Sequence, residues 1–123
     1  MAEPSLAGCN ILIVEDEYLL AEELRAELED EGAQVIGPAG TVQEALALVR
    51  DTRHLDGAVL DLNLGGEPSC PVAQALTERG APLVFATGYD LSVLPPRFAP
   101  VPRCEKPLNM RRLTAELRRA VHA

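Results

Sequence analysis

Acidic, hydroxyl and cationic side chains stand directly after apolar runs at four places in this chain. They are Glu15 with Asp16, Asp61, Thr87 and Lys106. Carboxylates without histidine or cysteine neighbours favour a hard cation such as Mg²⁺, which keeps several waters and reaches phosphate oxygens. The lysine ammonium can pair with another phosphoryl oxygen, and the threonine hydroxyl can hydrogen-bond a third. Asp61 would be the nucleophile, as in aspartyl-phosphate chemistry, with catalysis by positioning and charge neutralisation.

Taken alone, each of these residues has a simpler explanation. The acids at 15–17 are favoured at the start of a helix by its dipole, Asp61 suits an ordinary turn, and Lys106 suits a solvated surface. Two observations favour the functional interpretation. All four positions fall at strand ends on one side of the expected sheet. Lys106 is also the only lysine among 11 cationic residues, which indicates a site that needs a compact charge on a flexible stem.

Short apolar runs alternate with helical patterns along the whole chain. Strands are predicted over residues 9–14, 34–36, 58–60, 82–86 and 100–104. Helices are predicted over residues 17–31, 41–50, 71–79 and 110–121. This alternation predicts parallel strands joined by right-handed crossovers, and hence a three-layer α/β/α sandwich. Ligands bind beyond the carboxyl ends of the strands in such sheets.

Capping residues support the predicted helix ends. Thr41 followed by Glu44 forms a capping box, Asn109 suits the N-cap of the last helix, and Gly32 stands where a left-handed residue closes the first helix. Residues 90–100 differ, because they contain three prolines and no helical pattern. The helix expected between the fourth and fifth strands is therefore predicted to be weak or absent.

Length, charge and cysteine spacing limit the class of protein. The 123 residues predict one domain over 1–123 with no output domain. The formal charge of −8 opposes binding to nucleic acid or an anionic membrane. No apolar run spans a bilayer and no signal peptide is evident, so a cytoplasmic location is expected. The three cysteines form no pattern typical of disulfide frameworks or zinc sites.

From residue 10 to 121, the chain resembles the receiver domain of two-component response regulators. The matching motifs are the Ile-Leu-Ile-Val-Glu-Asp-Glu run at 11–17, Leu-Asp-Leu-Asn at 60–63, Ala-Thr-Gly at 86–88 and Lys-Pro at 106–107. The resemblance implies a flavodoxin-like five-stranded parallel sheet of order 2-1-3-4-5. It also implies that the Lys-Pro peptide is cis.

The resemblance assigns roles to individual residues. Asp61 would be the phosphoacceptor. Asp16 would bind Mg²⁺ directly together with Asp61, Glu15 would hold a metal-bound water, and the backbone carbonyl of Asn63 would complete the metal site. Two further residues would contact the phosphoryl group after transfer, with Thr87 as the switch hydroxyl and Lys106 as its ion-pair partner.

Residues 85–89, Phe-Ala-Thr-Gly-Tyr, are similar to the motif of the atypical FAT GUY receiver subgroup. Ordinary receivers carry a switch aromatic three residues before the lysine, and Arg103 stands there in this chain. Tyr89 or Arg103 would then substitute for part of the switch. We also expect residues 90–100 to be mobile without phosphate and to become ordered on phosphorylation.

The sequence therefore predicts a single-domain response regulator rather than an enzyme with an external substrate. Its phosphoryl donor would be a histidine kinase, of HWE or related type, or a phosphotransfer protein. It would signal by contact with a further protein or act as a phosphate sink.

Three alternatives are weaker. A phosphatase of the haloacid dehalogenase type needs a second acid where Asn63 stands. A receiver-shaped module that is never phosphorylated would usually lack one of the site residues. A DNA-binding regulator is opposed by the negative charge.

Overall fold

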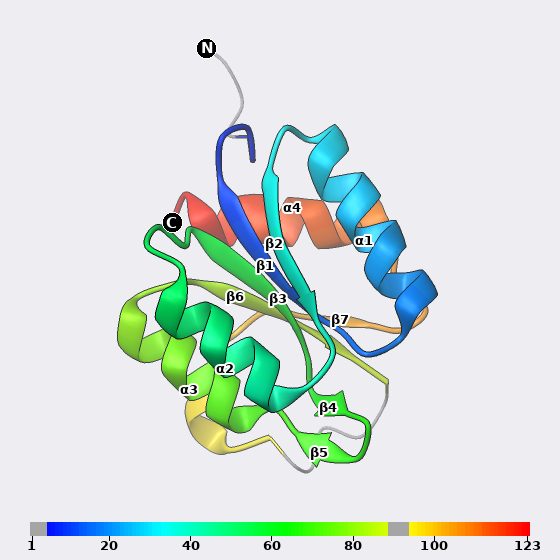
Figure 1. Cartoon of the computed structure of the whole chain (residues 1–123). Helices are drawn as coiled ribbons and strands as arrows, with labels where there is room; N and C mark the ends of the chain where they lie inside the picture. Colours follow the sequence, from blue (N-terminus) through cyan, green and yellow to red (C-terminus); the bar gives the residue numbers. More distant parts are fainter. Residues whose placement is uncertain (1–4, 89–93) are drawn as a thin grey trace.

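A computed structural model describes residues 5–88 and 94–123 of the chain. Five parallel strands form one sheet of order β2-β1-β3-β6-β7 (Figure 1). The strands are Asn10–Val14, Gln34–Ala39, Gly57–Asp61, Leu83–Thr87 and Arg103–Glu105, for β1, β2, β3, β6 and β7 in turn. This is the predicted flavodoxin-like order, with the strand neighbours 2-1-3-4-5 once the small hairpin β4–β5 is left aside.

Four α-helices cover the two faces of the sheet (Figure 1). They are α1 (Tyr18–Asp30), α2 (Val42–Asp51), α3 (Cys70–Arg79) and α4 (Met110–Val121). Leu12 and Val14 of β1 pack in a core cluster with α2 and α3, whereas Ile11 and Ile13 pack in a second cluster with α1 and α4. The sheet is buried on both faces, which explains why its strands are nearly continuous apolar runs.

The predicted caps are present. The Thr41 hydroxyl accepts the Glu44 N–H at 3.1 Å, and the Asn109 side chain accepts the Arg112 N–H at 3.1 Å. Gly32 follows the end of α1 with a φ of 88°, the left-handed conformation that glycine adopts without a steric penalty. The helix ends predicted from Thr41, Asn109 and Gly32 are therefore confirmed.

Two regions differ from the predicted elements. The turn expected after Asp61 is a small antiparallel hairpin, in which β4 (Asn63–Leu64) pairs with β5 (Glu67–Pro68). The last strand was expected over 100–104 but runs from Arg103 to Glu105. That prediction placed the strand too early because Pro100 and Pro102 lack the N–H that a sheet ladder needs.

Between β6 and β7, the regular element in residues 94–102 is a single 3₁₀ turn, η1 (Pro96–Phe98). Phe98 is 2% exposed and its ring meets that of Phe85 edge to face at 6.0 Å. Over residues 94–100, this short turn agrees with the weak helix expected at 90–100, of which residues 90–93 lie outside the described residues. The sequence did not predict that Phe98 would pack in the core. None of the helices in the described residues is long and apolar enough to cross a bilayer.

Candidate functional site

Four strands end at one edge of the sheet, and each brings a polar residue there. The residues are Glu15, Asp16, Asp61, Thr87 and Lys106. The register keeps these ends together, since Asp61 pairs with Ala86 and Thr87 pairs with Glu105. The structure therefore brings all five predicted residues to the carboxyl edge of the sheet, where the sequence placed them.

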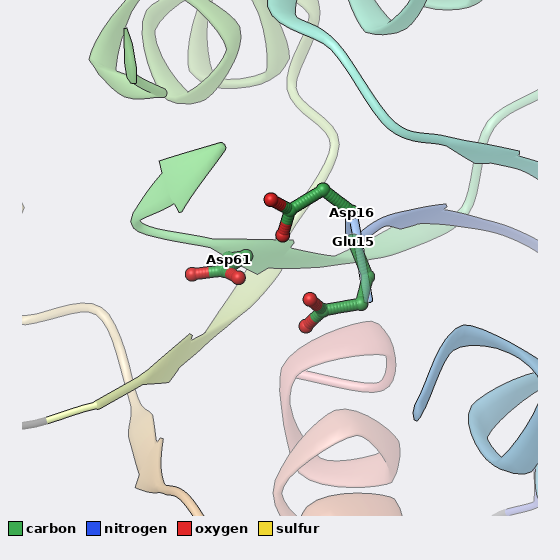
Figure 2. A group of neighbouring side chains, drawn as sticks. All are labelled: Glu15, Asp16 and Asp61. Atoms are coloured by element: carbon green, nitrogen blue, oxygen red, sulfur yellow. The ribbon is translucent and has the colours of Figure 1, made fainter. Parts of the chain in front are cut away.

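Three carboxylates form a compact acidic cluster at this edge. Glu15, Asp16 and Asp61 each offer one oxygen, and these oxygens lie within 4.8 Å of one another (Figure 2). Glu15 and Asp61 are 3% and 5% exposed, whereas Asp16 is open to solvent. Among the described residues, Glu15 Oε1 is a buried oxygen that accepts no hydrogen bond. A set of carboxylate oxygens without nitrogen or sulfur ligands suits a hard divalent cation such as Mg²⁺.

The ammonium of Lys106 lies among the buried acids. Its Nζ is 2.9 Å from Asp61 Oδ2 and 3.0 Å from Glu15 Oε1, with exposed Glu17 at 3.9 Å. The hydrogen bond to Glu15 goes to Oε2 at 3.3 Å, because only that oxygen has suitable geometry. Partial burial alone would lower the pKa of Lys106, but hydrogen bonds and charge attraction from the two acids outweigh it and raise the pKa. Lys106 is therefore cationic and directed at Asp61.

Glu15 is the acid whose ionisation is most perturbed. Burial raises its pKa to about 7, and the nearby Asp61 charge adds to the increase. The Glu17 N–H, which donates to Glu15 Oε2 at 3.1 Å, and the Lys106 ammonium act in the opposite direction. Glu15 therefore changes charge near neutral pH, and a bound cation would favour its ionised form.

Each oxygen of the Asp61 carboxylate has a donor from a different part of the chain. Oδ1 accepts the Asn63 N–H at 3.1 Å, and Oδ2 accepts the Lys106 ammonium at 2.9 Å. The backbone carbonyl of Asp61 accepts the Ser69 hydroxyl at 2.5 Å. Asp61 is thus fixed at both its side chain and its backbone, as a preorganised nucleophile should be.

Thr87 is buried at the end of β6, within the same edge of the sheet. Its backbone carbonyl accepts the Lys106 N–H at 2.7 Å. Thr87 and Lys106, the two residues predicted to contact the phosphoryl group, are therefore joined by a backbone hydrogen bond. The peptide between Lys106 and Pro107 is cis, as the family resemblance implied.

Asn63 begins the β4–β5 hairpin directly beside the acidic cluster. Its side-chain oxygen accepts the Gly66 N–H at 2.8 Å, so this oxygen serves the turn. Pro68 lies opposite Asn63 in the hairpin and has no N–H to donate to the Asn63 carbonyl. This arrangement is compatible with the predicted use of that carbonyl as a metal ligand.

Of the two predicted switch substitutes, Arg103 lies within the described residues. Arg103 lies in β7 opposite Phe85, and its guanidinium donates to the Ala99 carbonyl at 3.0 Å. This contact places the Arg103 guanidinium at the end of η1. Tyr89 lies outside the described residues.

Ser69 is the site residue that sequence reasoning missed. A serine before Cys70-Pro71 suggests an ordinary helix N-cap. The Ser69 side chain makes no hydrogen bond to α3, however, and instead donates to the carbonyl of Asp61, eight residues earlier. No local pattern signals such a contact, because it depends on how the hairpin returns the chain.

Comparison with known proteins places the geometry in context. No family model matches the chain. SdrG from Sphingomonas melonis Fr1 is 43% identical over 94% of this chain and 98% of its own, with a TM-score of 0.80. SdrG from Pseudomonas melonis Fr1, in its BeF3-activated conformation, is 46% identical over 85% of this chain and 89% of its own, with a TM-score of 0.69.

Two further proteins are similar. The signal receiver domain of a modulated diguanylate cyclase from Desulfovibrio desulfuricans G20 is 30% identical over 94% of each chain, with a TM-score of 0.82. The transcriptional regulatory protein PdtaR from Mycobacterium tuberculosis is 31% identical over 81 residues, which are 65% of this chain. This chain spans 39% of the length of PdtaR.

Proposed function

Because this chain belongs to the receiver-domain family of response regulators, we propose that Asp61 accepts a phosphoryl group from a phosphohistidine donor. The observation that carries the proposal is the Asp61 carboxylate itself. It is 5% exposed, lies at the carboxyl edge of the sheet, and is held between a cation and two further acids. A buried acid that only filled a turn would need neither the ammonium nor the acidic neighbours.

The transfer forms one bond and breaks one. A carboxylate oxygen of Asp61 attacks phosphorus, the P–N bond to the donor imidazole breaks, and the imidazole keeps the electron pair. The product is an acyl phosphate on Asp61. Hydrolysis by water later returns the carboxylate and releases inorganic phosphate. The protein thus promotes its own phosphorylation and slow dephosphorylation without acting on an external substrate.

Residues of this chain would hold the metal that such a transfer requires. Asp16 and Asp61 would bind Mg²⁺ directly, Glu15 would hold a water on it, and the Asn63 carbonyl would complete the site. A bound Mg²⁺ would neutralise charge that develops on the phosphoryl oxygens.

The chain's own cation and hydroxyl would complete the charge balance. In the resting site Lys106 pairs with Asp61 Oδ2 at 2.9 Å. After transfer, Lys106 would pair with a phosphoryl oxygen, because the carboxyl group of the acyl phosphate no longer carries a negative charge. Thr87 would donate its hydroxyl to another phosphoryl oxygen. The beryllofluoride-activated state of SdrG supports this proposal, since a relative 46% identical over 85% of this chain has an activated conformation.

At the level of the cell, we propose a cytoplasmic response regulator of the FAT GUY subgroup. Its donor would be a histidine kinase of HWE or related type, or a phosphotransfer protein. Its output would be a contact with a further protein or removal of phosphate from a relay. Nucleic acid and membranes are not expected partners, since the net charge is −8.

Acetyl phosphate provides the direct test. The intact protein is incubated with acetyl phosphate and Mg²⁺, and its mass is followed over time. We expect a gain of one phosphoryl group that is lost in Asp61→Asn and on chelation of Mg²⁺. Asp51→Asn is the matched control, because Asp51 is an exposed aspartate in α2. No gain in the wild type, or an unchanged gain in Asp61→Asn, would refute the proposal.

A further inference from the structure

Ser69 is a buried polar residue at the boundary between the β4–β5 hairpin and α3. It is 0% exposed, and its backbone dihedrals are φ −93° and ψ 9°. A serine N-cap normally has extended backbone and accepts an N–H of its own helix. Ser69 shows neither property, since no side-chain hydrogen bond to α3 is present. Helix capping therefore does not explain this hydroxyl.

The hydrogen bonds of Ser69 close a loop that begins at the proposed phosphoacceptor. Its hydroxyl donates to the Asp61 carbonyl at 2.5 Å, and its N–H donates to the Leu62 carbonyl at 3.1 Å. Leu62 and Leu64 are buried in the core cluster beneath this loop. The loop is therefore held at both ends and along its length.

The same stretch of backbone orients the Asp61 carboxylate. Asn63, two residues later, donates its N–H to Asp61 Oδ1 at 3.1 Å. The other oxygen lies 2.9 Å from the ammonium of Lys106, which follows the edge strand β7. A shift of the Asp61 backbone would move both contacts together. Small displacements of a nucleophile are costly, since a misplacement of about 1 Å can slow a reaction about 100-fold.

We infer that Ser69 is a positioning residue for phosphoryl transfer, because its hydroxyl holds the Asp61 backbone at the place where the carboxylate meets both Asn63 and Lys106. This inference rests on the proposed phosphorylation of Asp61. Ser69 touches neither the carboxylate nor the phosphoryl group, and acts only through the Asp61 carbonyl. Ser69 is also joined to the first turn of α3, because its carbonyl accepts the Val72 N–H at 2.9 Å.

The test compares Ser69→Ala with Thr77→Ala at saturating Mg²⁺. Thr77 lies in α3, and its hydroxyl donates to the Ala73 carbonyl at 2.8 Å. Each variant loses one hydrogen bond from a side-chain hydroxyl to a backbone carbonyl. We expect Ser69→Ala to slow phosphorylation by acetyl phosphate about tenfold, and Thr77→Ala to keep the wild-type rate. Rates are measured by intact mass, well below the melting temperature of each variant.

Two conservative variants separate positioning from stability. Ser69→Thr keeps the hydroxyl but adds a methyl group in a fully buried place, so it should lose stability and retain most of the rate. Ser69→Cys keeps the size with a weaker donor, and it should transfer at an intermediate rate. It also serves as the test variant should Ser69→Ala fail to fold. The carbonyl ¹³C resonance of Asp61 should shift in Ser69→Ala and Ser69→Cys but not in Thr77→Ala.

The outcomes distinguish this inference from the proposed function. If the wild type is phosphorylated and Ser69→Ala reacts at the same rate, the inference is overturned but the proposed function stands. Ser69→Cys takes the place of Ser69→Ala in this comparison if Ser69→Ala does not fold. Equal slowing in Thr77→Ala also overturns it, because loss of stability would then explain the effect. A wild type that gains no phosphoryl group overturns both the inference and the proposed function.

Discussion

At the carboxyl ends of β1 and β3, ion pairs and hydrogen bonds hold buried charged groups together, whereas residues 94–103 pack on the core through the Phe98 ring and the partly buried side chains of Leu94 and Val101. Asp61 has a donor at each carboxylate oxygen and a third at its carbonyl. In the second region, Phe98 packs on Phe85, and Arg103 donates to the Ala99 carbonyl at 3.0 Å. The two regions meet in β6, since Phe85 and Thr87 belong to the same strand.

This difference suggests a division between chemistry and signalling. A site that transfers a phosphoryl group requires fixed groups, because preorganised charges need no rearrangement during the reaction. A surface that reports phosphorylation must have two arrangements of similar energy. The five changes below test this division, from the largest expected effect to the smallest.

Lys106→Met should have the largest effect. It removes the ammonium that lies 2.9 Å from Asp61 Oδ2, and with it the cation available to the phosphoryl oxygens. We expect phosphorylation by acetyl phosphate to slow by about 1,000-fold, as when one transition-state donor is lost. Intact mass spectrometry measures the rate. Arg111→Met removes an exposed cation from α4 as the control, and equal effects of the two changes would contradict the assigned role.

Phe98→Ala should act on the second region. The ring is 2% exposed, so its loss should leave a cavity and cost about 3–4 kcal/mol of unfolding free energy. Urea denaturation measures the cost. Arg97→Ala is the control, since its guanidinium lies 4.8 Å from the centre of the Phe98 ring, a contact worth about 0.5–1 kcal/mol. Phosphorylation of the folded Phe98→Ala protein should stay close to normal. Loss of phosphorylation in the folded variant would show that the acidic cluster depends on the packing of Phe98.

The stability of the metal-free protein should depend on pH through Glu15. Its pKa is about 7 in the folded protein and about 4.5 in an unfolded chain, so the folded state binds more protons between these values. The contribution is fully present below pH 4.5 and is lost as the pH rises through about 7, on the order of 2–3 kcal/mol. Urea denaturation of wild type and Glu15→Gln at pH 5 and pH 8 measures it.

Glu15→Gln should be less sensitive to pH than the wild type over this window. Added Mg²⁺ should restore stability to the wild type at pH 8, because the cation favours the ionised acid. Parallel pH profiles of the two proteins would show that Glu15 does not titrate there.

Gly65→Ala should cause a smaller loss. Gly65 has a φ of 58°, and a Cβ there would lie 3.8 Å from Asp16 Oδ2. The backbone strain should cost about 1 kcal/mol, and the added methyl should weaken Mg²⁺ binding several-fold. Gly66→Ala is the control in the same hairpin, since its φ is 93° and its Cβ would meet nothing within 4 Å. Titration with Mg²⁺ should separate the two variants. Identical affinities would show that the hairpin does not border the metal site.

Arg103→Met should have the smallest effect. It removes the hydrogen bond to the Ala99 carbonyl, worth about 1 kcal/mol. Amide hydrogen exchange should accelerate at Phe98, Ala99 and Val101, whose N–H groups close the turns of this region. The Asn63 amide, which donates to Asp61, should be unaffected and serves as the internal control. Faster exchange at Asn63 as well would show direct coupling of the two regions.

The positions of the reactive residues could be predicted from sequence because parallel topology alone determines them. Glu15, Asp61, Thr87 and Lys106 each follow an apolar run, and parallel strands put such residues at one edge. The burial of the sheet on both faces was likewise visible in uninterrupted apolar runs. These features depend on local patterns and on one rule of connection.

The contacts that refine the site could not be predicted in this way. The Ser69 hydroxyl meets Asp61 only because the hairpin reverses the chain between them. Phe98 enters the core from a segment whose prolines indicate irregular backbone, and the Arg103 guanidinium donates to the backbone carbonyl of Ala99. Each of these contacts depends on the path of an irregular backbone segment, and such segments have no periodic sequence pattern from which the path could be predicted.

The ion pairs of Lys106 also restrict where amine chemistry can occur on this molecule. No other side chain in the sequence carries a primary amine. An acyl donor reacts only with the neutral amine, and the raised pKa of Lys106 keeps its nitrogen protonated near neutral pH. Acylation of Lys106 should therefore be slow while Asp61 and Glu15 hold it, and faster when either acid is replaced. The rate at which an amine-directed label reaches Lys106 Nζ, followed by peptide mapping to separate it from the α-amino group, would report the integrity of the acidic cluster.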